Sequence, residues 1–232
     1  MSIRAVAWDI DGTLVDSEPV HLLALKATCA QFGADISDLA DDRFIGVNML
    51  DVWRDLRPRM PGHIDRRQFL ETINTHYRDL AHHLRPMPHA PEAIRELAQA
   101  GLRQVAVSNS ARVVVDTNLA LAGLGRHLEF SLSLDDVSTG KPDPEPYLQA
   151  ARRLGLPPAE IVAVEDSDTG ARSAHAAGLE VIRLDWPGAG NAGRARMSDL
   201  QQVSDTILDM ARHQGQPVPP GPGMRKTIAN ET

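Results

Sequence analysis

Short apolar runs alternate along the chain with longer segments in which apolar positions recur at helical spacing. Nearly continuous apolar runs of this length are typical of strands buried on both faces of a parallel sheet. The runs occupy residues 5–8, 104–107, 161–164 and 181–184. Four helical segments end in glycine followed by leucine, as expected for left-handed helix caps, at Gly101, Gly123, Gly155 and Gly178. This alternation predicts an α/β fold with a doubly wound, mainly parallel sheet.

The pattern changes between residues 17 and 85, where no buried-strand run occurs. Apolar residues in this segment, such as Leu22, Trp53 and Phe69, recur mostly at helical spacings. Ser17, followed by a glutamate and a proline, has the features of a helix N-cap. We therefore expect an all-helical domain inserted into the α/β domain.

The patterns together predict three regions. The α/β core is expected to consist of residues 1–16 and 86–213, and the helical cap of residues 17–85. The α/β pattern resumes at Pro91, which fits the first turn of a helix. Residues 214–232 are rich in proline and glycine with little to bury, so we expect a disordered tail.

Composition narrows the class of protein. The 232 residues are 42% hydrophobic and 24% charged, which is ordinary for a soluble protein, and no apolar run approaches the ~18 residues of a membrane helix. A net charge of −7 disfavours a nucleic-acid partner, although a divalent cation among acidic side chains still permits a small phosphorylated metabolite as substrate. One cysteine, Cys29, and no signal-like N-terminus favour a cytoplasmic location. The oligomeric state is not indicated.

Two carboxylates follow the first predicted strand. Asp9 and Asp11 are separated by one residue and are followed by Gly12, which allows the chain to turn at once. Such a pair suits divided roles, one carboxylate as nucleophile or metal ligand and the other as general acid. An ordinary Asp-Gly turn explains the same residues equally well.

Further polar residues follow the other predicted strands or a turn. Ser108 and Asn109 come after the second strand and before a helix, where hydroxyl, amide and helix-start groups can hold an anionic oxygen. Lys141 lies beside a proline turn and is one of three lysines in the chain. A simple helix cap and a solvated surface lysine remain the alternatives.

Two adjacent acids, Glu165 and Asp166, follow the run at residues 161–164. With Asp9 they form an oxygen-only set that suits a hard cation such as Mg²⁺, whereas a helix cap is the alternative. The carboxyl ends of parallel strands share one edge of the sheet. The joint occurrence of polar residues at these strand ends therefore favours a single site over separate caps and turns.

These motifs, in this order, resemble those of the haloacid dehalogenase-like hydrolases, and within them the beta-phosphoglucomutase-like phosphatases. The resemblance covers about residues 3–185. It rests on Asp9 to Ser17 (DIDGTLVDS), Ser108-Asn109-Ser110, Lys141-Pro142 and Glu165-Asp166-Ser167. The resemblance implies a Rossmann-like core, a helical cap and a magnesium-dependent phosphatase.

The resemblance also implies roles for individual residues. Asp9 would attack phosphorus and become an aspartyl phosphate, and Asp11 would first protonate the leaving oxygen and then deprotonate water. Mg²⁺ would contact the Asp9 carboxylate, the Asp11 backbone carbonyl and the Asp166 carboxylate, with Glu165 nearby. Lys141 would neutralise the phosphoryl group while pairing with Asp9.

Other family roles concern binding and the cap. Ser108 and Asn109 would bind the phosphoryl group, and His21 would help to orient Asp11. Asn48 lies in a loop that resembles the family's substrate-contacting cap loop. A surface histidine and a helix-breaking turn are the alternatives for these two cap residues. The cap itself would be mobile, with hinges near residues 15–18 and 85–91.

The sequence departs from the sugar-phosphate mutases of this group. They carry an arginine in the cap loop for the second phosphate, whereas this chain has Met49. We therefore expect hydrolysis of a sugar or polyol monophosphate, with a mutase as the alternative. The mutase remains open because three arginines nearby offer a replacement cation: Arg54, Arg57 and Arg59.

Less favoured activities are a phosphoglycolate phosphatase and a phosphonate hydrolase. The family's phosphonate hydrolase needs a cap lysine, and Lys26, the lysine in the cap, lies early in a helix. Asp11 argues against a dehalogenase, because a halide leaving group needs no acid. A binding protein without catalysis is disfavoured because none of Asp9, Asp11, Lys141 or Asp166 is missing.

Overall fold

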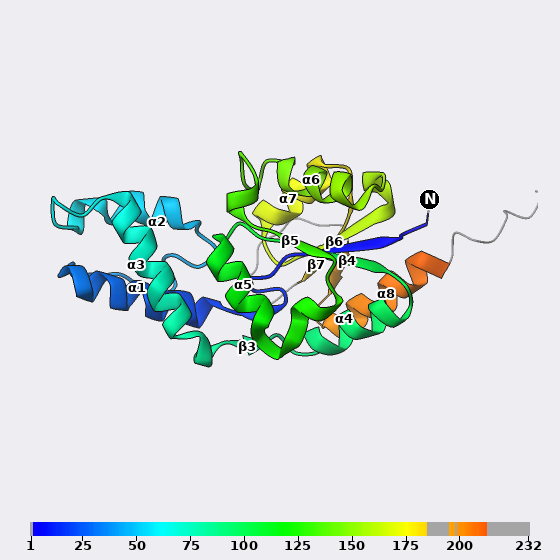
Figure 1. Ribbon diagram of the computed structural model, residues 1–232, viewed down its shortest axis with the longest axis horizontal. Helices are drawn as coiled ribbons and strands as arrows, with labels where there is room; N and C mark the ends of the chain where they lie inside the picture. Colours follow the sequence, from blue (N-terminus) through cyan, green and yellow to red (C-terminus); the bar gives the residue numbers. More distant parts are fainter. Residues whose placement is uncertain (1, 185–194, 198, 213–232) are drawn as a thin grey trace, which may run out of the picture.

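The computed structural model describes residues 2–184, 195–197 and 199–212. An α/β region and a helical region lie at opposite ends of the long axis (Figure 1). The tail predicted for residues 214–232 lies outside the described residues. Among those that are described, no helix is both long enough and apolar enough to span a bilayer.

A six-stranded parallel sheet forms the core of the α/β region, in the order β5-β4-β1-β6-β7-β8. Its strands are β1 (Ala5–Trp8), β4 (Arg103–Val107), β5 (Phe130–Leu132), β6 (Ile161–Glu165), β7 (Glu180–Leu184) and β8 (Ala195–Met197). All four strands expected from apolar runs are present, and the fold class is confirmed. The two edge strands β5 and β8 were missed, because three-residue strands leave no clear apolar run.

Helices cover both faces of the sheet (Figure 1). Alternate side chains of each strand point to opposite faces. Val6 and Trp8 of β1 pack in one apolar cluster with α4 (Ala90–Gln99), α5 (Arg112–Ala120) and α8 (Leu200–Arg212). Ala5 and Ala7 pack in the other with α6 (Glu145–Leu154) and α7 (Asp168–Ala176). Burial on both faces explains why the strands are apolar throughout.

The helical cap is inserted between two short strands, β2 (Val15–Asp16) and β3 (Arg85–Pro86), which pair antiparallel. Its α-helices are α1 (Glu18–Phe32), α2 (Met49–Leu56) and α3 (Arg66–Asp79). Short 3₁₀ turns follow α2 at Arg57–Arg59 and α3 at Ala81–His83. Trp53 of α2 packs on Phe69 of α3 with ring centroids 5.1 Å apart, and both belong to the apolar cluster that continues into the core beneath the cap. The exact division at residues 16 and 86 and the mobility of the cap stay predictions.

One detail of the cap differs from the sequence analysis. Ser17 precedes α1, and Pro19 occupies its first turn, but the Ser17 side chain makes no cap hydrogen bond. Its hydroxyl instead donates to Asp11 Oδ1 at 2.8 Å. The carboxylate is the stronger acceptor for this hydroxyl, because hydrogen bonds to charged groups are worth more than neutral ones.

Candidate active site

The candidate site lies at the carboxyl edge of the sheet, beneath the cap. Trp8 of β1 is in register with Ala106 of β4 and Val164 of β6, so these neighbouring strands end at the same level. The residues that follow therefore emerge together. They line one cavity of about 1630 Å³, which cap residues of α1, α2 and α3 also line.

A buried lysine bridges two carboxylates at the floor of this cavity. Lys141 Nζ donates to Asp9 Oδ1 and to Glu165 Oε1, each at 2.6 Å, and to the Val107 carbonyl at 2.8 Å. Burial lowers the pKa of Lys141, but the charges of Asp9 and Glu165 outweigh it and raise this pKa above its ordinary value. Lys141 is therefore a cation next to Asp9, in the pairing that the family resemblance implies, and its role in catalysis stays a prediction.

Three carboxylates crowd the same place. Asp9, Glu165 and Asp166 each offer an oxygen within 4.8 Å of the others, a spacing that suits one metal ion. Burial, followed by the charge of Glu165, raises the pKa of Asp9, and the same two causes raise the pKa of Asp166 to about 7. A divalent cation at this oxygen-only set relieves the repulsion, so these residues fit a hard metal ion.

Two glycines allow the carboxylates to come this close. A Cβ on Gly12, whose φ is +76°, would lie 2.2 Å from Asp166 Oδ2. A Cβ on Gly170 in α7 would lie 1.9 Å from Glu165 Oε2. A side chain at either position would overlap a carboxylate of the acidic cluster. Only glycine, which has no Cβ, leaves room for the carboxylates as they lie.

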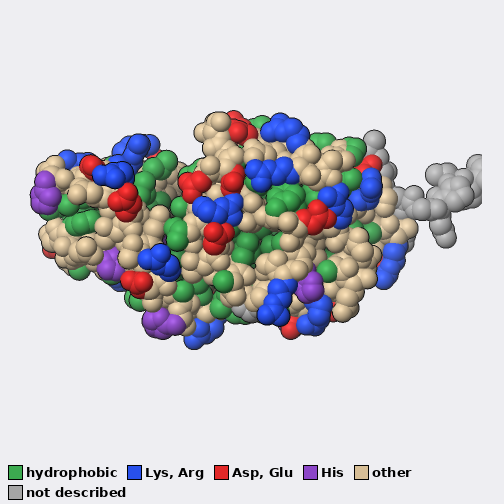
Figure 2. Space-filling view, viewed as in Figure 1, with side chains coloured by type: hydrophobic (Ala, Val, Ile, Leu, Met, Phe, Trp, Pro, Cys, Tyr) green, Lys and Arg blue, Asp and Glu red, His purple; other side chains and the backbone are tan. Residues whose placement is uncertain are grey.

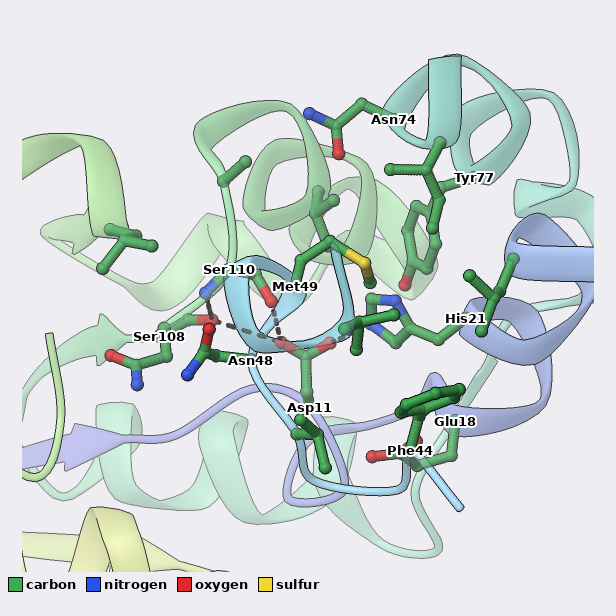
Figure 3. Close-up of a pocket in the computed structure, with 18 of the residues that line it drawn as sticks. Asp11, Glu18, His21, Phe44, Asn48, Met49, Asn74, Tyr77, Ser108 and Ser110 are labelled. Atoms are coloured by element: carbon green, nitrogen blue, oxygen red, sulfur yellow. Dashed lines mark hydrogen bonds and ion pairs between the residues drawn. The ribbon is translucent and has the colours of Figure 1, made fainter. Parts of the chain in front are cut away.

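Asp11 lies beside the cluster, with its side chain surrounded by hydrogen-bond donors (Figure 3). Its carboxylate oxygens accept from Ser17 Oγ, His21 Nε2, Ser108 Oγ, Ser110 Oγ and Asn118 Nδ2. Burial alone raises the pKa of Asp11, but the hydrogen bond and charge of His21 and the serine hydrogen bonds lower it below the ordinary value. The surroundings therefore favour the ionised form of Asp11.

The residues that follow β4 form hydrogen bonds to Asp11 and to the loop that carries Lys141. Ser108 Oγ lies 3.2 Å from Asp11 Oδ2 and accepts a hydrogen bond from the Ser110 amide. Asn109 donates to the Lys141 carbonyl at 2.9 Å and accepts from the Lys141 amide at 2.7 Å. Asn109 thus fastens the lysine loop to β4, and its role in binding a phosphoryl group stays a prediction.

Two predicted residues come from the cap. His21 of α1 lies with Nε2 3.4 Å from Asp11 Oδ1, which places it where it can orient this carboxylate. Asn48 caps α2, because its side chain accepts from the Leu50 and Asp51 amides. Asn48 also lines the cavity, so a substrate contact remains a prediction beside its role as a helix cap.

The arginines that line the cavity are not Arg54, Arg57 and Arg59, which the sequence offered as replacement cations. Of the described residues, those that line the cavity from α2 include Met49 but not Arg54, and the arginines of Arg57–Arg59 are also absent from the lining. Arg54 pairs instead with Asp51. The arginines that do line the cavity belong to the cap helix α3 and the core helix α5: Arg66, Arg67, Arg78 and Arg112.

Sequence reasoning missed three buried residues around the site. Tyr147 of α6 donates to Glu165 Oε1, and Asn118 of α5 and Tyr77 of α3 lead to Asp11. The sequence contains a signal for Asn118, because this polar residue lies at helical spacing among the apolar residues of the buried face of α5. The two tyrosines look like ordinary core residues at helical spacing, so no local pattern marked them.

Comparisons with known proteins agree with this geometry. The family model of haloacid dehalogenase-like hydrolases matches residues 6–184. Hexitol phosphatase B of Escherichia coli (strain K12) is 30% identical over 212 residues, 89% of this chain and 94% of that protein. A plasmid phosphoglycolate phosphatase of Cupriavidus necator is 30% identical, with 88% of each chain covered.

Solved structures share the fold. CbbY from Rhodobacter sphaeroides in complex with phosphate aligns over 89% of this chain and 99% of that chain, with a TM-score of 0.79 and 23% identity. The family model covers more than half of the sequence, and the two relatives above, which match most of the chain, are named as phosphatases. This chain therefore belongs to the haloacid dehalogenase-like hydrolases and is a phosphoric monoester hydrolase of that family.

Proposed function

We propose that the protein is a Mg²⁺-dependent phosphatase that hydrolyses a sugar or polyol monophosphate through an aspartyl phosphate on Asp9. One observation carries the proposal: Asp9 lies between a lysine that is held as a cation and an acidic cluster that fits a metal ion. Phosphoryl transfer is accelerated mainly by positioning and by neutralisation of charge. The floor of the cavity offers both.

The chain's own residues divide the two half-reactions. An Asp9 carboxylate oxygen attacks phosphorus while the ester P–O bond breaks, and the leaving oxygen takes a proton from Asp11. Water then attacks the same phosphorus and gives its proton to Asp11, the bond to Asp9 breaks, and inorganic phosphate leaves. Lys141 Nζ holds Asp9 in place and offsets the charge of the phosphoryl oxygens in both steps.

The metal would be held by the carboxylates of Asp9 and Asp166 and the backbone carbonyl of Asp11, with Glu165 beside it. When bound, Mg²⁺ supplies charge neutralisation to the phosphoryl oxygens. Protonation of Asp11 for the first half-reaction is favoured by the arrival of a negatively charged phosphate next to it, because like charge raises the pKa of a carboxylate.

The relatives and the cavity support the substrate class. Among the relatives are proteins named hexitol phosphatase, phosphorylated carbohydrates phosphatase and fructose-1-phosphate phosphatase. Asn48 and Asn74 line the cavity beside apolar side chains and offer amides for the hydroxyl groups of a sugar or polyol. Figure 2 shows basic and acidic side chains interspersed on the visible face, which fits a small substrate better than a nucleic acid. We infer a cytoplasmic location because the single cysteine, Cys29, is a free thiol.

A phosphoglycolate phosphatase is a second candidate, because a protein of that name matches with equal identity. Arg66 and Arg78 line the cavity and suit the carboxylate of such a substrate. A mutase is less favoured, since Met49, at the start of α2, stands where the mutases carry an arginine, and Arg54 lies outside the cavity lining.

A phosphate-release screen tests the proposal. The panel holds hexose phosphates, hexitol phosphates, phosphoglycolate, phosphogluconate and nucleotides, each with Mg²⁺ and with chelator. Asp9→Asn serves as the blank, and Asp205→Asn, at an exposed acid of α8, is the matched control. We expect metal-dependent phosphate release that Asp9→Asn abolishes and Asp205→Asn keeps. Full activity of Asp9→Asn would refute the nucleophile, and turnover to an isomeric phosphate without release would favour the mutase.

A further inference from the structure

A buried amide joins the cap to Asp11. Asn118 of α5 is fully buried, and its Nδ2 donates to Asp11 Oδ1 at 2.9 Å. On the other side of the same amide, Oδ1 accepts a hydrogen bond from the Tyr77 hydroxyl at 2.7 Å. Tyr77 belongs to the cap helix α3, so a chain of two hydrogen bonds runs from the cap through the core to the catalytic carboxylate.

Two partners hold the amide in one direction. A buried amide can present either its oxygen or its nitrogen to a neighbour, and its partners decide between them. The Asp11 carboxylate only accepts hydrogen bonds, so the Asn118 nitrogen faces it, and the Asn118 oxygen on the other side accepts from the Tyr77 hydroxyl. Burial, followed by the charge of Asp11, raises the pKa of Tyr77, so the phenol keeps the proton that this hydrogen bond needs.

This arrangement makes the two oxygens of Asp11 unequal. Oδ1 faces the Asn118 N–H group, which donates and cannot accept, beside the Ser17 hydroxyl and His21 Nε2. Oδ2 faces the hydroxyls of Ser108 and Ser110, which can turn and accept as well as donate. Asn118 therefore gives Oδ1 a donor whose direction is fixed, whereas the partners of Oδ2 are hydroxyls that can turn.

The same tyrosine also supports a second partner of Asp11. The ring of His21 lies 4.5 Å from the ring of Tyr77, centroid to centroid, and His21 Nε2 approaches Asp11 Oδ1. Figure 3 shows Tyr77 and His21 side by side above Asp11. Loss of the Tyr77 ring would therefore disturb both contacts, whereas loss of its hydroxyl alone isolates the link through Asn118.

We propose that Tyr77 and Asn118 are positioning residues that orient Asp11 when the cap is docked. The inference rests on the proposed function, because it assigns to Asp11 the acid/base role given there. It adds two residues, one in the cap and one in the core, that act on the reaction only through Asp11.

The test uses the dependence of the rate on the leaving group. An alkyl phosphate needs a proton from the acid, whereas p-nitrophenyl phosphate releases a phenolate that leaves without one. kcat/KM reports the first half-reaction, in which Asp11 acts as the acid. For Tyr77→Phe we expect kcat/KM to fall by about fivefold for the best alkyl phosphate of the panel, and by less than about twofold for p-nitrophenyl phosphate.

A double variant separates positioning from stability. Asn118→Leu leaves the Tyr77 hydroxyl unpaired and takes a donor from Asp11, so it is expected to destabilise the protein. Tyr77→Phe with Asn118→Leu removes the unpaired hydroxyl and is expected to recover part of that loss. Under our proposal the double variant keeps the defect with alkyl phosphates although its stability is partly restored. Should Asn118→Leu fail to fold, Tyr77→Phe and the double variant still decide the question.

Two further measurements complete the test. Thr28→Val removes another buried cap hydroxyl, which bonds only to the Ala24 carbonyl, and is expected to keep the wild-type ratio of the two substrates. In an Asp11→Ala background, the burst rate of p-nitrophenol release is expected to be the same with Tyr77 and with Tyr77→Phe, since the effect passes through Asp11.

The outcomes are distinct for the two proposals. Wild-type ratios in Tyr77→Phe and in the double variant would overturn the positioning role while leaving a phosphatase that depends on Asp9. An equal loss for both substrates, or a loss that persists in the Asp11→Ala background, would overturn it as well, because it would show a structural effect. Absence of any metal-dependent phosphatase activity in the wild type would overturn the proposed function and this inference together.

Discussion

Replacement of Lys141 by methionine is expected to destabilise the metal-free protein by about 3–5 kcal/mol and to abolish activity. Methionine keeps the length and the apolar stem of lysine and removes only its charge and donors. The side chain of Lys141 is 3% exposed and lies between the carboxylates of Asp9 and Glu165. Its loss leaves two buried carboxylates without their counter-ion.

The magnitude follows from the contacts. Nζ lies 2.6 Å from an oxygen of each carboxylate. At an effective dielectric constant of about 20, each contact corresponds to a gross attraction of about 6 kcal/mol. Desolvation of the three groups opposes this attraction, and removal of one partner of a buried pair typically costs about 3–5 kcal/mol. We therefore take about 3–5 kcal/mol, and not the gross attraction, as the expected loss of stability.

The direction in which the destabilisation by Lys141→Met changes with pH also follows from the buried charges. Without Lys141, the pKa of Asp9, which burial and the charge of Glu165 already raise, would rise further. At low pH Asp9 takes up a proton and the cost of its missing partner disappears; at high pH Asp9 must ionise without that partner. The destabilisation by Lys141→Met should therefore be small near pH 5 and largest at pH 8.

Urea unfolding at both pH values measures the effect, with fluorescence of the buried tryptophans Trp8 in the core and Trp53 in the cap. Lys26→Met is the matched control, because Lys26 makes an exposed ion pair with Asp41 and its loss should change stability little. Glu165→Gln added to Lys141→Met should recover part of the lost stability. Equal stability of Lys141→Met and wild type at pH 8 would refute the account of the buried charges.

Three further predictions concern the acidic residues and their glycine. Gly170→Ala should lower activity at least tenfold and reduce stability, measured by phosphate release and urea unfolding, because its Cβ would lie 1.9 Å from Glu165 Oε2; a fully active variant would contradict the required contact. Asp11→Asn should stall turnover with phosphate on Asp9, detected by mass spectrometry of the quenched enzyme; unchanged steady-state rates would count against the acid/base role. Apparent Mg²⁺ affinity, measured by calorimetry, should weaken as pH falls below about 7, since the pKa of Asp166 is raised to about 7 and protons compete with the metal; a pH-independent affinity would exclude Asp166 as a ligand.

The α/β core could be predicted because each strand, and the residue that follows it, can be recognised from a few neighbouring positions in the sequence. A strand buried on both faces must be apolar, and the residue after it must lie at the sheet edge, so Asp9, Ser108 and Asp166 were placed by their position in the sequence. Lys141 was harder, because no strand precedes it directly and its direction depends on the loop that Asn109 fastens. The family resemblance implies that Lys141 pairs with Asp9. The structure shows that the two hydrogen bonds of Asn109 hold the Lys141 loop where this pair can form.

The surroundings of Asp11 could not be read in this way. Ser17 has the pattern of a helix cap, and a serine before a proline gives no sign that a carboxylate is its acceptor. Asn118 and Tyr77 lie 41 residues apart in the sequence and meet only because α3 of the cap packs against α5 of the core. Contacts between the cap and the core depend on how the two regions pack together, which no periodicity within either region encodes.

The distribution of charge explains why a cation and a proton compete for this site. The carboxylates of Asp9 and Glu165 hold the ammonium group of Lys141 beneath the cavity, and the charges of Asp11 and Asp166 lie close to Asp9. A phosphate dianion that entered this field alone would be repelled, so a second source of positive charge must be present when substrate binds. Protons on Asp9 or Asp166 can relieve the repulsion, but a protonated Asp9 is a poor nucleophile. A divalent cation relieves the same repulsion and leaves Asp9 ionised, so metal should bind before or together with substrate.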